Sequence, residues 1–68
     1  MYNEYDCFLL TKQIPNDTFV EVGTCGVILM ILNDSPPVYE VEFGDGKGGN
    51  IGNKTYTLSE EYMQKALS

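Results

Sequence analysis

The stretch that decides the fold is Val38-Tyr39-Glu40-Val41-Glu42-Phe43, and the glycine-rich run 44–49 follows it at once. Apolar and acidic side chains alternate along it, and this period of two is typical of a β-strand that is buried on one face only. The alternation predicts that Tyr39, Val41 and Phe43 face the core and that Glu40 and Glu42 face outward. The glycines indicate a hairpin connection to a further strand.

Further strands are predicted on both sides of this stretch. Residues 5–12 have an apolar centre and end at turn-forming residues, a short extended piece covers 19–22, and residues 25–32 form a second long strand. Residues 50–58 form the last strand, in which Gly52 marks a bulge or a sharp coil. Short strands separated by Gly and Pro turns favour an all-β fold, here a small SH3-like antiparallel barrel of four to five strands.

The second strand carries an unbroken apolar run from Val27 to Leu32, so both of its faces need cover. A short C-terminal helix is predicted after it in the chain, with Ser59 as N-cap and two glutamates in the first turn. This helix would pack on the sheet through Tyr62, Met63, Ala66 and Leu67. Either the helix or a partner is expected to cover the apolar strand.

The charge balance restricts the class of partner. The 68 residues, read as one domain over 1–68, hold ten acidic residues and four lysines, with no Arg or His, for a net charge of −6. A direct nucleic-acid partner is not expected, because phosphate binding needs Lys and Arg. An anionic membrane surface is disfavoured for the same reason. The negative charge would steer the chain toward a basic protein partner, but the charge by itself is better explained by solubility.

The sequence also indicates location and cysteine state. The first six residues lack a basic segment and an apolar run, which predicts no signal peptide, and no stretch is long enough to span a membrane. A cytoplasmic protein is therefore expected. Cys7 and Cys25 are predicted to be reduced thiols that act as small core residues.

Catalysis is not expected. Without His, a Ser-His or Cys-His pair cannot form, and neither cysteine has a basic neighbour in sequence to activate it. The spacing Gly44-x-Gly46-x-x-Gly49 matches a dinucleotide-binding loop, but no helix or parallel strand can follow it, so a turn is the better interpretation. No cofactor and no metal site are predicted, since Asp34 and Asp45 offer too few ligands for calcium.

Several motifs resemble a family of short bacterial proteins of unknown function. They are Glu4 to Thr11, Ile14-Pro15, Val22 to Ile28, the strand Tyr39-Glu40-Val41-Glu42-Phe43, and Thr57-Leu58-Ser59. The resemblance implies an SH3-like barrel and no catalytic residues. Some members occur beside toxin genes, so it also implies an immunity role by association.

These observations predict a binding surface on the strand 38–43. Glu40 and Glu42, with Asp34 and Asp45 in the loops at its ends, would form an acidic stripe, and Met30 and Tyr39 would be apolar anchors beside it. The predicted function is a protein-binding inhibitor, an immunity protein or antitoxin that occludes a basic nuclease-type toxin. The alternative is a regulatory or scaffolding SH3-like module. Monomer and homodimer both stay open, because edge strands can pair.

Overall fold

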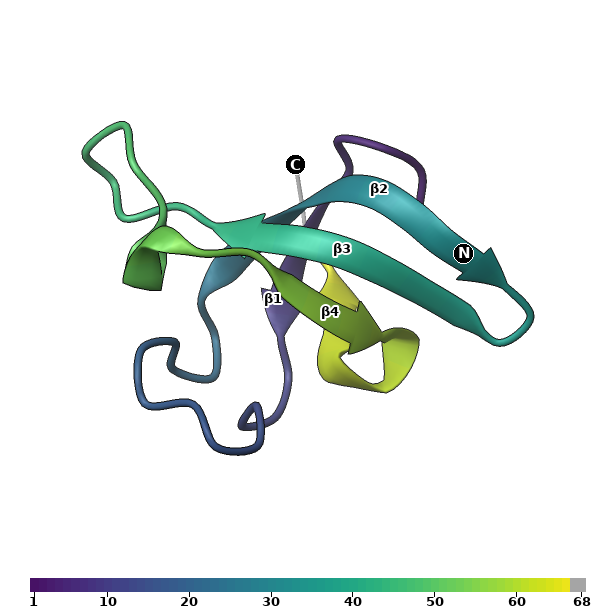
Figure 1. Cartoon of the computed structure of the whole chain (residues 1–68), viewed down its shortest axis with the longest axis horizontal. Coiled ribbons are helices and arrows are strands. Elements are labelled where there is room, and N and C mark those ends of the chain that lie inside the picture. The colour runs from purple at the N-terminus through teal and green to yellow at the C-terminus, as the bar shows by residue number, and fades with distance from the viewer. Residues whose placement is uncertain (67–68) are drawn as a thin grey trace.

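The computed structural model describes residues 1–66, which are folded as one curled antiparallel sheet (Figure 1). The spatial order of the strands is β4-β3-β2-β1-β5. The predicted all-β fold is confirmed, and the small barrel takes the form of a half-barrel. The strands are β1 (Cys7–Leu10), β2 (Cys25–Asp34), β3 (Pro37–Phe43), β4 (Tyr56–Ser59) and β5 (Met63–Lys65).

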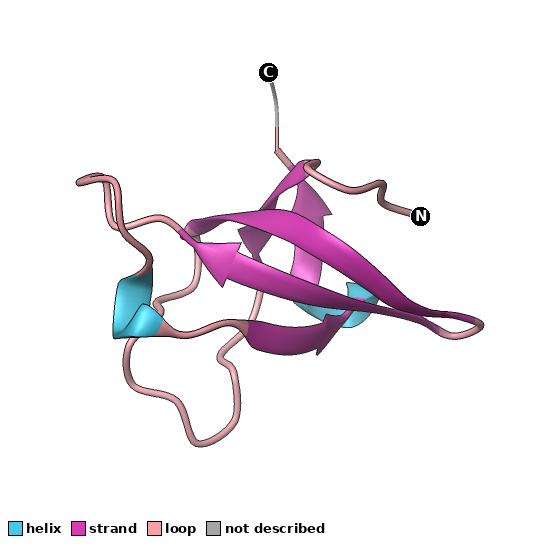
Figure 2. Ribbon diagram, turned by 45° about the horizontal axis from the view of Figure 1, so that its top comes forward, coloured by secondary structure: helices cyan, strands magenta, loops and turns pink. Residues whose placement is uncertain are grey.

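The curl follows from how the two edge strands are joined. β4 and β5 lie at opposite edges of the sheet, and only the 3-10 turn η2 (Glu60–Tyr62) connects them (Figure 2). In a flat sheet these edges would lie about 19 Å apart, at about 4.8 Å per strand spacing. Four extended residue steps reach at most about 14 Å, and a 3-10 turn covers less. The sheet must therefore curl until its edges approach one another.

The predicted C-terminal helix is wrong. Residues 60–62 form a single 3-10 turn in which Ser59 makes no side-chain cap, and residues 63–65 continue as β5. The reason is that the backbone of β1 offers a free edge, which β5 pairs with in the register Leu10 to Met63 and Leu9 to Gln64. The expectation for Leu67 falls outside the described residues. No helix within residues 1–66 is long and apolar enough to cross a membrane.

Hydrogen bonds hold the η2 turn against the sheet. The Tyr39 hydroxyl donates to Glu60 Oε2 at 2.6 Å and accepts from the Tyr2 backbone N–H at 2.9 Å. Thr11 donates its backbone N–H to the Tyr62 carbonyl and its hydroxyl to the Glu61 carbonyl. The turn that closes the half-barrel is thus attached to β3 and to the end of β1.

Other segments also differ from their predicted form. The expected extended piece at 19–22 belongs to the loop between β1 and β2 and forms no strand. The expected strand 50–58 is shorter, because residues 51–53 form the 3-10 turn η1. Gly52 lies inside that turn at φ 73°, a conformation that glycine adopts without a side-chain clash.

Aromatic rings fill the concave side of the sheet. Tyr39, Val41 and Phe43 are each 0% exposed, which confirms the predicted inward face of β3. The rings of Phe8 and Phe43 meet edge to face with centroids 5.5 Å apart. Tyr56 continues the row beyond Phe43 at 5.5 Å. Such contacts add to the apolar burial that stabilises a small domain.

Gly26 sets how closely these rings approach the sheet. It lies on β2 opposite Phe8 on one side and Phe43 on the other. A Cβ atom at this position would lie 2.5 Å from the Phe8 ring and 2.9 Å from the Phe43 ring. Glycine is therefore required here by space, and the two phenylalanine rings occupy the volume that a side chain would fill.

We expect Gly26→Ala to lower the free energy of unfolding by about 1–3 kcal/mol, because both rings must move out of well-packed positions. Gly44→Ala is the matched control, since an added Cβ there meets nothing within 4 Å. The control should stay within about 0.5 kcal/mol of the wild type. Urea unfolding curves measure both. Equal stability of the two variants would contradict the packing role of Gly26.

Candidate functional site

The convex side of the β2–β3 pair carries the predicted glutamates. Glu40 and Glu42 alternate with the buried residues of β3 and are half-buried on the opposite face. The register places Met30 directly opposite Glu40 and Val27 directly opposite Glu42. On the other side of β3, Thr57 lies opposite Glu40. We call this surface the outer face, defined by Val27, Met30, Glu40, Glu42 and Thr57.

Hydroxyl and amide groups hold the two carboxylates in place. Thr57 Oγ1 donates to Glu40 Oε1 at 2.8 Å, and Thr55 Oγ1 donates to the other Glu40 oxygen. Asn50 Nδ2 donates to Glu42 Oε2 at 3.3 Å. An ionised carboxylate has about four acceptor positions, so both side chains keep capacity for further donors. The outer face thus presents two positioned, negatively charged groups.

The apolar part of the outer face results from irregular pairing in β2. The register shifts between Ile28 and Met30, and again between Ile31 and Asn33. Each shift is a bulge, and a bulge redirects the side chains that follow it. Met30 is 53% exposed and Leu32 47% exposed. The apolar run from Val27 to Leu32 was expected to be covered on both faces, but Met30 and Leu32 are exposed.

Two predicted acidic residues lie away from the outer face. Asp34 is exposed at the end of β2, and Asp45 lies in the loop after β3, at the opposite end of the hairpin (Figure 1). Asp45 Oδ1 accepts the backbone N–H groups of Lys47 and Gly49, at 2.7 Å and 3.1 Å. Its carboxylate stabilises its own loop. The structure therefore brings together Glu40, Glu42 and Met30, and it does not add Asp34 or Asp45 to them.

The prediction that Tyr39 is a surface anchor is wrong. Its side chain is 0% exposed, because Tyr39 shares the inward face of β3 with Val41. Burial raises the pKa of the Tyr39 hydroxyl, and its hydrogen bond to Glu60 adds to this effect. Tyr39 positions the η2 turn and offers no surface to a partner.

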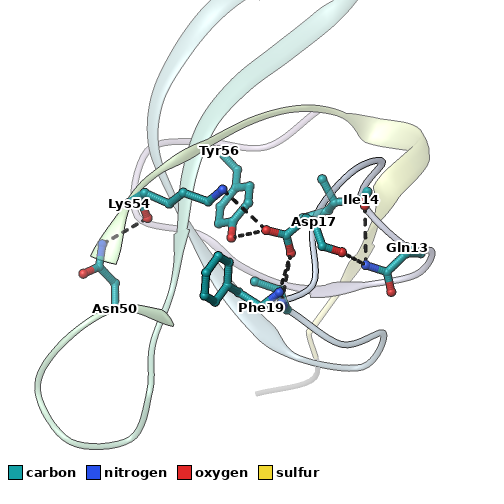
Figure 3. Close-up of polar contacts among 8 residues, drawn as sticks. Gln13, Ile14, Asp17, Phe19, Asn50, Lys54 and Tyr56 are labelled. Atoms are coloured by element: carbon teal, nitrogen blue, oxygen red, sulfur yellow. Dashed lines mark hydrogen bonds and ion pairs between the residues drawn. The ribbon is translucent and has the colours of Figure 1, made fainter. Parts of the chain in front are cut away.

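The β1–β2 loop contains a buried carboxylate, Asp17, that the sequence did not indicate. Asp17 is 8% exposed, and side chains from two separate segments converge on it (Figure 3). Its Oδ2 accepts the N–H groups of Phe19 and Val20 at 3.1 Å and 3.0 Å. Its Oδ1 accepts the Tyr56 hydroxyl at 2.7 Å and pairs with Lys54 Nζ at 3.5 Å.

These partners keep Asp17 ionised. Burial alone would raise the pKa of this carboxyl, but the donors from Tyr56, Val20, Phe19 and Lys54 together lower it. The Lys54 ammonium also lies over the rings of Phe19 and Tyr56. A carboxylate engaged in this way makes a poor general base. The cluster anchors the loop to β4, and only the turn-forming pair at residues 16 and 17 could have suggested it.

We expect Tyr56→Phe to lower the free energy of unfolding by about 1–2 kcal/mol at neutral pH, because Asp17 loses a donor. Burial, with the Asp17 hydrogen bond, raises the pKa of Tyr56 to about 12. Since an unfolded tyrosine ionises near pH 10, this contribution is complete below pH 10 and is lost between about pH 10 and 12. The difference between the two proteins should therefore shrink over that range.

Urea unfolding of both proteins from pH 7 upward measures this difference. Tyr5→Phe is a control, because the Tyr5 side chain is 74% exposed. It should follow the wild type throughout. A constant gap between wild type and Tyr56→Phe would contradict the proposed coupling of Tyr56 to Asp17.

No group of three or more His, Cys, Asp or Glu side chains within residues 1–66 is arranged to hold a metal ion. Cys7 and Cys25 are free and exposed, so the prediction that they are core residues is wrong. Their strand neighbours Phe8 and Gly26 are buried, and the period of two places both cysteines outward.

Comparisons with protein-family models, with curated proteins and with solved structures found no match. The resemblance drawn from the sequence motifs therefore stays a prediction.

Proposed function

We propose that the outer face binds a basic protein, and that the chain acts as an inhibitor of a nucleic-acid-processing toxin by covering its cationic surface. The observation that carries this proposal is the pairing of Met30 with Glu40 across β2 and β3, which puts an exposed apolar side chain beside a fixed carboxylate. Protein interfaces commonly combine such an anchor with polar groups around it.

The distribution of charge supports a cationic partner. All four lysines lie outside β2 and β3, and two of them are engaged, Lys12 with Glu61 and Lys54 with Asp17. Nothing on these two strands offsets the glutamates. Opposite charge would speed association with a basic protein and disfavour acidic ones. By occupying lysine and arginine side chains that otherwise hold phosphate groups, such binding would block nucleic acid from its site.

The charge requirement is tested with the double variant Glu40→Gln/Glu42→Gln, which keeps the side-chain shape and one acceptor oxygen at each position. Proteins captured from the source organism by the wild-type chain are identified, and their affinities for the variant are measured. We expect a basic partner whose affinity falls at least about tenfold and whose binding weakens with added salt. The matched control is Glu4→Gln/Glu21→Gln, which removes the same charge from exposed positions elsewhere.

Equal loss in both double variants would mean that only net charge matters, and it would contradict a specific outer face. A partner that is not basic, bound equally by all three proteins, would favour the scaffolding module over the inhibitor. Inhibition by the wild-type chain of nuclease activity in the captured partner would complete the proposal.

The apolar anchor is tested separately with Met30→Ala. Because Met30 is 53% exposed, the free energy of unfolding should change by less than about 0.5 kcal/mol. The affinity for the partner should fall by about tenfold, as for a hot-spot residue. Val22→Ala is the control, since Val22 is 55% exposed in the β1–β2 loop. If the control weakens binding as much as Met30→Ala does, the loop is the contact and the outer face is not.

A further inference from the structure

Cys7 and Cys25 are diagonal neighbours on the adjacent strands β1 and β2. β1 pairs with β2 so that Cys7 is opposite Val27 and Leu9 is opposite Cys25. These four residues share the convex side, because Phe8 and Gly26 between them are buried. Cys7 and Cys25 are the only cysteines in the chain. Two thiols from strands separated by the long β1–β2 loop are therefore brought together by the fold.

In the β1–β2 ladder, each cysteine belongs to a non-hydrogen-bonded pair, the kind in which opposite Cα atoms lie closer together. Leu10 donates its N–H to the Thr24 carbonyl, and Ile28 donates to the Asp6 carbonyl, on either side of the Phe8–Gly26 pair. By alternation, Cys7–Val27 and Leu9–Cys25 are non-hydrogen-bonded pairs, whose Cα atoms lie about 4.5 Å apart. Diagonal neighbours lie about 7–8 Å apart by Cα and closer by Cβ. A disulfide joins Cα atoms up to about 6.8 Å apart, so closure requires a small shift of β1 along β2 that shortens this diagonal.

The surroundings allow a reagent to reach both thiols. Cys7 and Cys25 line a hollow of about 530 Å³, with Tyr5, Asp6 and Lys65 among its other walls. Partial desolvation of its sulfur raises the pKa of the Cys25 thiol, and the neighbouring Cys7 adds to this through charge and hydrogen bonding. The fold therefore does not stabilise the thiolate of Cys25. A protein that stabilises its reduced thiolate favours the open form of a disulfide pair, and Cys25 has no such stabilisation.

We propose that Cys7 and Cys25 are a redox site that closes to an intramolecular disulfide by exchange with a low-molecular-weight disulfide. One cysteine thiolate attacks a sulfur of the reagent, which forms a mixed disulfide and releases one thiol. The second cysteine thiolate then attacks the protein sulfur of the mixed disulfide and releases the second thiol. Two protein thiols are oxidised, one reagent disulfide is reduced, and both protons end on the released thiols. The product links β1 to β2 on the convex side.

The test uses the folded full chain, reduced and then incubated with glutathione disulfide, and reads the products by mass spectrometry after acid quenching. The wild type should become lighter by two hydrogens and carry no glutathione. Cys7→Ser and Cys25→Ser, which cannot close, should each carry one glutathione. A wild type that carries two glutathiones, or that stays reduced while the single variants are modified, would overturn the proposal.

A second measurement separates a fold-directed bond from chance closure. The disulfide is titrated with glutathione buffers of varied ratio, in native buffer and in concentrated urea. If the fold brings the thiols together, half-reduction of the native protein should need a ratio [GSH]²/[GSSG] at least about tenfold higher than in urea. An equal or lower ratio would overturn the proposal. Neither measurement involves a protein partner, so its outcome is independent of the proposed function.

Discussion

The fold depends on the short turn that joins its two edge strands. With three residues between β4 and β5, the sheet has to bend, and the bend creates the concave side in which the rings pack. Several contacts keep the turn in position; among them, Tyr39 donates to Glu60, the first residue of the turn, and Thr11 donates to the carbonyl of Tyr62, its last residue. A buried tyrosine hydroxyl needs a partner when it leaves water. The hydrogen bond from Tyr39 to Glu60 therefore links the centre of the sheet to the turn that joins its two edges.

The core inside this bend is filled by aromatic rings at close range. Gly26 lets Phe8 and Phe43 approach the backbone of β2, and Tyr56 extends the row toward the β1–β2 loop. At that end the Tyr56 hydroxyl projects from the apolar core and donates a hydrogen bond to Asp17. A single tyrosine therefore joins the core to the polar cluster that fixes the loop. Within this loop, which has no regular secondary structure, the Asp17 carboxylate satisfies two backbone donors, those of Phe19 and Val20.

The sequence alone predicted the part of the fold that follows local periodicity. The alternation of β3 identified its buried face and its outward glutamates, since every second residue there is apolar. The two bulges of β2 could not be read from six apolar residues in a row, because no residue type marks where pairing slips. A C-terminal helix was predicted from capping residues, but residues 63–65 form a strand because they pair with the free edge of β1.

The candidate site was predicted only in part, because local periodicity does not specify which residues of neighbouring strands lie opposite one another. Glu40 and Glu42 were assigned from alternation, whereas the pairing of Met30 with Glu40 depends on the register and on a bulge. Asp17 was missed because its partners lie 37 and 39 residues further along the chain, at positions 54 and 56. The outward cysteines were also missed, since apolar neighbours in sequence say nothing about which face each residue takes.

A half-barrel retains two open edges, and their lengths have a consequence for self-association. β4 has four residues and β5 has three. A strand from another molecule that added to either edge would gain only a few backbone hydrogen bonds. Short edge strands are a recognised protection against uncontrolled sheet growth. The small size of the outermost strands thus keeps an acidic chain that presents exposed Met30 and Leu32 from extending its sheet into aggregates.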